Sequence, residues 1–147
     1  MRDGVLSFEM QRLRIVAIVT LVVHAVVGVL HELAHRDLGI ELTQVQTLFV
    51  NLVILAAPVV AVVLLWSRAQ TAGALLFAGA MAASLLFGLY YHYVLVSPDH
   101  VSHLPDGDLQ TAFRITALLL ALVQALGAAV GLRGIALCRS PEGTGSG

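Results

Sequence analysis

Charged side chains are scarce in this sequence, and lysine is absent from it. Only 12% of its 147 residues are charged, whereas 59% are hydrophobic and the mean hydropathy is +0.91. A soluble domain carries about 25% charged residues, so the polar side chains are too few to cover a surface that faces water. The net charge of −1 excludes nucleic-acid binding through a basic face. Because Cys138 is the single cysteine, an intrachain disulfide is excluded as well.

Long apolar segments take the place of a polar surface. A hydrocarbon core about 30 Å thick requires about 20 apolar residues in a helix. Four segments meet that requirement: residues 13–33, 47–66, 72–96 and 115–137. The first segment is longer than the apolar core of a signal peptide, about 7–15 residues, so we expect it to be a retained span. The sequence therefore predicts an all-α integral membrane four-helix bundle in one domain, residues 1–140, with a flexible tail over residues 141–147.

The arginines are distributed unevenly between the two sides of such a bundle. With four spans, six of them fall on the side of the termini: Arg2, Arg12, Arg14, Arg68, Arg133 and Arg139. Only Arg36 and Arg114 fall on the other side. Because basic residues are retained in the cytoplasm, we expect both termini to be cytoplasmic and the first and third connections to face outward. The expected location is the plasma membrane of a bacterium or archaeon.

Small residues recur at four-residue spacing in the third and fourth segments. Gly127 and Gly131 form a GxxxG motif, and Gly79 and Ala83 repeat that spacing. Helices in lipid approach one another closely at such residues. The spacing favours packing among the four helices of one chain. The same residues could instead pack against a second copy of the chain or against the subunits of a larger membrane complex. Either would be a partner in addition to the lipid bilayer.

Histidines gather toward the outward face. Five of the six lie at or near it: His31, His35, His92, His100 and His103. The sixth, His24, lies deeper in the first segment. Steps of four, three and four residues keep side chains on one helix face, so His24, Gly28, His31 and His35 form one stripe. Imidazoles exposed to lipid are costly, and the stripe is therefore expected to face the interior of the bundle.

The stretch from His31 to His35 also has the pattern H-E-x-x-H. On a helix this spacing places two imidazoles on one face, where they can bind zinc, and the glutamate between them can activate a metal-bound water. Glu32 would be that base. The alternative is that both histidines cap the helix end and meet lipid headgroups.

The third connection adds further ligands at the same membrane face. Asp99, His100 and His103 lie close together in the sequence, and His92 ends the segment before them. The two groups are far apart in sequence, but the topology predicts that they meet. The sequence therefore predicts a metal centre for zinc or copper, with ligands drawn from His31, His35, His92, Asp99, His100 and His103. The alternative for the connection is a solvated polar loop.

The ten residues 31–40 resemble the motif helix of intramembrane zinc metalloproteases of the site-2 protease type. In that family HExxH lies in a transmembrane helix, and a later Asp-Gly supplies the third zinc ligand. Asp106-Gly107 is similar to that element. The resemblance implies that His31, His35 and Asp106 bind zinc and that Glu32 is the catalytic base.

Two other functions remain open at the level of sequence. Two histidines on different spans at similar depth can hold a haem iron, and His31 and His92 are the candidate pair. Four spans with short loops and small-residue faces also suit a non-catalytic accessory subunit of a larger complex. A transporter is less favoured, because no acidic residue lies at depth in any of the four segments.

Overall fold

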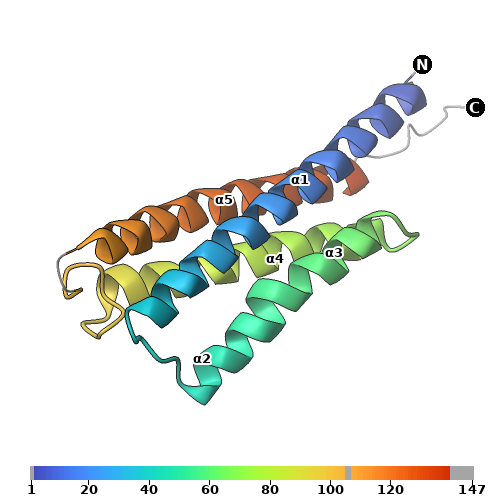
Figure 1. The fold of residues 1–147 in the computed structure, drawn as a ribbon. Helices are drawn as coiled ribbons and strands as arrows, with labels where there is room; N and C mark the ends of the chain where they lie inside the picture. The colour runs from blue at the N-terminus through green and yellow to red at the C-terminus, as the bar shows by residue number, and fades with distance from the viewer. Residues whose placement is uncertain (1, 105–106, 140–147) are drawn as a thin grey trace, which may run out of the picture.

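The computed structural model describes residues 2–104 and 107–139, and the described chain consists of helices joined by loops, without strands. Four long helical segments lie side by side (Figure 1). In chain order the elements are α1 (Arg2–Asp37), α2 (Gln44–Phe49), η1 (Val50–Ala56), α3 (Ala57–Leu65), α4 (Gln70–Leu89), η2 (Tyr90–Val94) and α5 (Asp108–Arg139). The second segment combines α2, η1 and α3, and the third combines α4 with η2.

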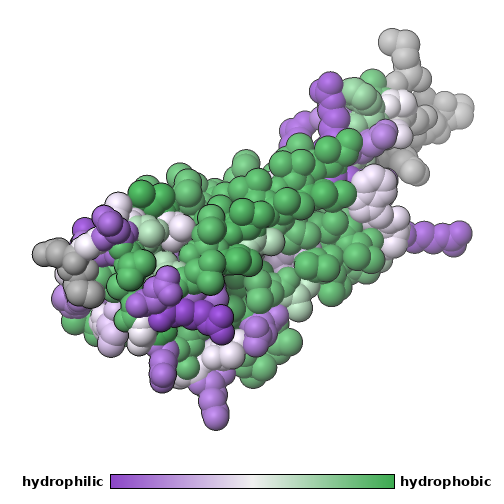
Figure 2. Space-filling view, in the orientation of Figure 1, coloured by the Kyte–Doolittle hydropathy of each residue, from purple (hydrophilic) through white to green (hydrophobic). Residues whose placement is uncertain are grey.

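All four segments are long and apolar enough to cross a membrane, which confirms the four predicted spans. They cover Gly4–Asp37, Gln44–Leu65, Gln70–Val94 and Asp108–Arg139. Figure 2 shows the corresponding surface, with a broad apolar band between polar residues at the two ends. The predicted tail, residues 141–147, lies outside the described residues.

The first helix begins well before its apolar part. The polar residues that precede Leu13 continue the same helix, because glutamate, glutamine and arginine are good helix formers. Glu9 accepts a hydrogen bond of 2.9 Å from Arg133 of α5, and the two form an ion pair. This contact holds the first turns of α1 against the end of the last helix.

The end of α1 is set by Gly39. Gly39 has φ +66°, a left-handed conformation that glycine adopts without the strain of a Cβ. Its N–H bonds to the carbonyl of Arg36, and the N–H of Ile40 bonds to the carbonyl of His35. This pair of bonds is a Schellman cap. It ends the helix at Asp37, two residues after His35, and turns the chain toward α2.

Two stretches of π-helix interrupt the regular geometry. In the second segment, η1 comes just before Pro58, which has no N–H for the carbonyl four residues earlier. The N–H of Ala57 bonds instead to the carbonyl of Leu52, five residues back. In the third segment, the N–H of Leu95 bonds to the carbonyl of Tyr90, again five residues back. Such widened turns often occur at functional sites, and the second of them carries His92.

The apolar core fills the end of the bundle near the termini. Its centre is formed by fully buried side chains of α1, α3 and α4, among them Ala17, Leu65, Phe77 and Met81. At the opposite end α2 diverges from the other helices (Figure 1). The two ends of the bundle therefore differ. The end near the termini is closed by apolar packing, and the opposite end contains a cavity.

The GxxxG motif faces the inside of this bundle. A Cβ placed on Gly131 would lie 2.5 Å from the backbone nitrogen of Ala78, and one on Gly127 would lie 2.7 Å from the Met81 side chain. Both neighbours belong to α4. The favoured interpretation, packing within one chain, is therefore confirmed for these two glycines.

Candidate metal centre

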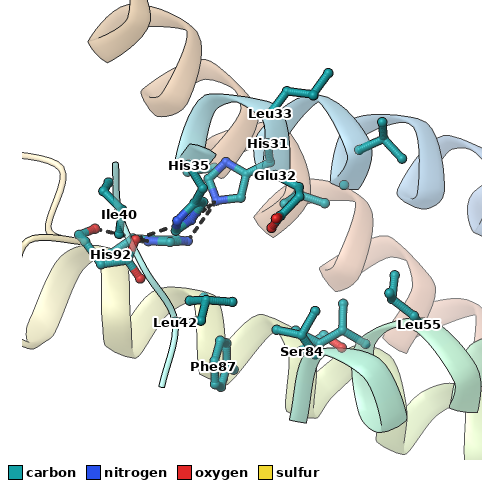
Figure 3. A pocket seen from close by; sticks show the side chains of 18 of the residues that line it. His31, Glu32, Leu33, His35, Ile40, Leu42, Leu55, Ser84, Phe87 and His92 are labelled. Carbon is teal, nitrogen blue, oxygen red and sulfur yellow. Dashed lines mark hydrogen bonds and ion pairs between the residues drawn. The ribbon is translucent and has the colours of Figure 1, made fainter. Parts of the chain in front are cut away.

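Three buried imidazoles meet at the end of the bundle opposite the termini. His31 and His35 come from the last turns of α1, and His92 comes from η2. The Nε2 atom of His31 lies 3.1 Å from Nε2 of His92 and 3.2 Å from Nε2 of His35. The three residues are 6–8% exposed, and their ligand atoms all lie within 4.8 Å of one another. Figure 3 shows the three rings converging. We call this group the histidine triad.

The partner of His31 indicates which of its nitrogens carries the hydrogen. Nδ1 of His31 lies 2.9 Å from the hydroxyl of Thr116 on α5. That hydroxyl has one hydrogen, and it donates it to the backbone carbonyls of Ala112 and Phe113, at 2.8 and 3.0 Å. With that hydrogen given to a carbonyl, the hydroxyl accepts from His31, which favours the tautomer with the ring hydrogen on Nδ1. Nε2 of His31 then presents a lone pair to the other two rings.

The same reasoning applies to His92. Its Nδ1 lies 3.2 Å from the backbone carbonyl of Asp99, and a carbonyl can only accept. Nδ1 of His92 therefore carries the hydrogen, and its Nε2 also presents a lone pair. The lone pairs of His31 and His92 face each other across 3.1 Å. Such an arrangement is stable only with a positive charge between them, which can be a shared proton or a metal ion.

Asp99 supports the triad from the third connection. Its Oδ1 lies 3.2 Å from Nδ1 of His92 and 3.3 Å from Nε2 of His35. Burial alone would raise the pKa of this carboxyl. The contact with the His92 ring and the attraction of the neighbouring imidazoles outweigh burial and hold the pKa of Asp99 below its ordinary value. The side chain is therefore a carboxylate at neutral pH.

His100 and His103 are not brought into the triad. His100 is half-buried and its Nδ1 bonds to the backbone and hydroxyl of Ser102, while His103 is exposed. Their rings lie 5.0 Å apart, beside each other. The reason is that Val101 and Leu104 of the same loop pack inward on Ala34 and Phe113. The side of the loop that carries these apolar residues therefore faces the bundle. The two histidines lie on its opposite side, away from the triad.

The remaining residues of the protease resemblance are placed differently. Glu32 is exposed, and its carboxylate lies 3.7 Å from Arg36 in the next helical turn. It lines the cavity beside the triad (Figure 3) but does not belong to the group of converging ligands. Asp106 lies outside the described residues.

Two partners from α5 were missed by reasoning on the histidines alone. Thr116 bonds to His31, as described, and the amide nitrogen of Gln124 lies 3.3 Å from Nε2 of His24. Both are isolated polar residues in an apolar segment, which is a sequence signal for interhelical hydrogen bonds. What this signal did not provide was the pairing.

A cavity of about 910 Å³ extends from the triad between α1 and η1. Its polar lining comprises the triad, Glu32, Asn51, Ser84, Asp99, His24 and Gln124, and its apolar walls include Val29, Ile54, Leu55, Phe87 and Leu120. Val29 and Leu55 are also exposed on the outer surface of the bundle. The cavity therefore opens at the side of the bundle, between two segments that are long and apolar enough to cross a membrane. We call it the α1–η1 cavity.

Comparison with known proteins gives no relative for this arrangement, since no family model, curated protein or solved structure matches the chain.

Proposed function

We propose that this membrane protein binds one zinc or copper ion through His31, His35 and His92. The observation that carries the proposal is the convergence of three buried imidazoles, whose ligand atoms all lie within 4.8 Å of one another. Zinc–nitrogen bonds of about 2.0–2.1 Å in a tetrahedral site place ligand nitrogens about 3.3–3.4 Å apart. The spacings of 3.1 and 3.2 Å within the triad are close to that value.

The surroundings of the triad support a metal more than a shared proton. Histidines that bind metals donate their second ring hydrogen to a carbonyl, carboxylate or hydroxyl, which fixes the tautomer and orients the ring. Nδ1 of His31 has Thr116 in this role, and Nδ1 of His92 has the carbonyl and carboxylate of Asp99. A proton shared by His31 and His92 would need the same tautomers, but it would not need a third imidazole, and Nε2 of His35 lies 3.2 Å from Nε2 of His31.

The same geometry bears on the kind of metal site. Three protein ligands with an open fourth position are typical of zinc sites that act on a molecule, whereas structural sites are closed by four. The triad borders the α1–η1 cavity, so a small molecule in the cavity could reach the ion. Haem is less well supported, because it needs a flat macrocycle between two imidazoles and here three rings close on one point. From the placement of the arginines, we infer that the site faces away from the cytoplasm.

The proposal is tested by elemental analysis of the purified protein. We expect close to one zinc or copper ion per chain after purification in the presence of each metal in turn. A His100→Ala, His103→Ala double variant is the matched control, because it removes two histidines of the same face that lie outside the triad. It should keep the ion. Protein without zinc or copper under these conditions would rule the proposal out.

The hydroxyl of Thr116 gives a subtler test of the same site. Thr116→Val keeps the shape of the side chain but removes the acceptor of the His31 hydrogen. Loss of such a partner typically weakens metal affinity about 10–100-fold, and we expect a change of that size in competition with a chromophoric chelator. Thr116→Ser restores the hydroxyl and should bind nearly as well as the wild type. Equal affinity of the valine variant and the wild type would contradict the assigned tautomer.

A further inference from the structure

A second polar group lies deep in the α1–η1 cavity, apart from the triad. His24 is 2% exposed and Gln124 is 4% exposed, and both line the cavity. His24 precedes His31 by seven residues, about 10 Å along the helix at about 1.5 Å per residue. Beyond this pair, toward the termini, the bundle is closed by its apolar core. His24 and Gln124 therefore form the polar floor of a cavity that ends at this depth.

The hydrogen bond between the two residues leaves each with an unused polar atom. The amide nitrogen of Gln124 can only donate, so Nε2 of His24 accepts and the ring hydrogen is on Nδ1. Among the described residues, the one side-chain hydrogen bond found for His24 and Gln124 is the bond between them, and neither Nδ1 of His24 nor Oε1 of Gln124 is among the fully enclosed unpaired atoms, which fits their place in the lining of the cavity. Buried polar groups are rarely left unpaired. The floor of the cavity thus offers one donor and one acceptor to an occupant.

We propose that the α1–η1 cavity binds an uncharged, membrane-dissolved molecule that carries a hydroxyl group. A hydroxyl is the simplest group that can either accept from Nδ1 of His24 or donate to Oε1 of Gln124. Ile54, Leu120 and Ala121 line the cavity with apolar side chains that suit an alkyl or ring body. The volume of about 910 Å³ lies within the range of about 300–1,000 Å³ for small-molecule sites. The sideways opening lets such a molecule enter from the bilayer.

Gly28 keeps the path between the triad and this floor open. It lies between His24 and His31 on the same face of α1 and lines the cavity, and a Cβ added to it would meet nothing within 4 Å. A larger side chain at this position would therefore occupy the cavity without disturbing the packing of the helices. Leucine would also favour the helix more than glycine does.

Two families of molecule share the required chemistry, namely alkyl hydroquinones and long-chain alcohols. The probes are dodecylhydroquinone and dodecanol, each compared with its methyl ether, and binding to the purified protein is measured by native mass spectrometry. We expect one molecule bound per chain for at least one hydroxyl probe, and at least about tenfold weaker binding of its ether, which cannot donate to Gln124. The probe that binds more tightly shows which of the two families of molecule the cavity prefers. Equal binding of the hydroxyl compounds and their ethers, or no binding of either, would overturn the proposal.

The position of the bound molecule is tested with variants. Gly28→Leu fills the cavity and Gln124→Leu removes the acceptor, so each should reduce probe binding at least about tenfold. Gly79→Leu is the matched control, because that glycine also meets open space but does not line the cavity. Metal content should be unchanged in all three, which separates this proposal from the metal site. Full probe binding in folded Gly28→Leu protein would show that the probe does not bind in the α1–η1 cavity. If Gly28→Leu does not fold, the Gln124→Leu variant tests the same assignment.

Discussion

A His92→Ala variant is expected to purify without metal. His92 supplies the ligand that comes from a second helix, and its removal leaves only His31 and His35, four residues apart on α1. Two imidazoles from one helix do not complete a zinc or copper site of three ligands. Loss of a ligand should therefore exceed the effect of losing a supporting group, which is about 10–100-fold in affinity. The measurement is metal content after dialysis, beside wild-type protein and a His100→Ala control.

The same substitution should lower thermal stability more when metal is present than when it is absent. Binding to the folded state stabilises it by about 2.7 kcal/mol at a metal concentration 100 times the dissociation constant, and His92→Ala would lose this contribution. Treatment with a chelator should narrow the difference between the wild type and the variant, leaving the part that comes from the lost contacts of His92 with Asp99. A His92→Ala protein that keeps its ion, or a melting difference that is as large with chelator as with metal, would place the metal elsewhere.

The four spans could be predicted from the sequence because their cause is local. Any helix that crosses a bilayer needs about 20 apolar residues, and each such run can be recognised without knowledge of its neighbours. The helix ends were harder to place. Polar residues before Leu13 continue the helix in water, and Gly39 ends it by a left-handed turn. The extension of α1 before Leu13 depends on helix propensity and on a contact with α5. A search for apolar runs detects neither of these.

The candidate site could be predicted only in part. His31 and His35 were evident from their spacing, and the topology brought His92 to the same face. The sequence did not separate His92 from His100 and His103, because proximity in the chain does not say which side of a loop faces inward. The structure shows that Val101 and Leu104 take the inward side by burial. A hydrophobic pattern within the loop was the signal that distinguishes them.

The partners on α5 follow from a register that the sequence does contain. Helices α1 and α5 run in opposite directions, so residues that face each other have numbers with a nearly constant sum. His31 pairs with Thr116 and His24 with Gln124, and the two sums differ by one. Two polar residues on each helix at matched spacing therefore predict a pairing, provided that the helices are known to be neighbours. That last fact comes from the tertiary structure.

A graded series of glycine substitutions tests how closely α4 and α5 must approach. At Gly131 a Cβ would lie 2.5 Å from the backbone nitrogen and 2.7 Å from Cα of Ala78. Backbone atoms cannot rotate away, so Gly131→Ala should force the helices apart at a cost of about 1–3 kcal/mol. At Gly127 the neighbour is the flexible side chain of Met81, which can move, so Gly127→Ala should cost less.

Gly79→Ala is the control of the series, because its expected change in stability has the opposite sign. A Cβ on Gly79 meets nothing within 4 Å, so alanine should stabilise the helix, by at most about 1 kcal/mol. Unfolding in detergent, followed by circular dichroism, should therefore rank Gly131→Ala below Gly127→Ala and both below Gly79→Ala. Equal stabilities across the series would mean that α4 and α5 do not meet at these glycines. Because α4 leads into η2 and α5 holds Thr116 against His31, a change in their spacing would also reach the triad, so metal affinity should fall in the order of stability.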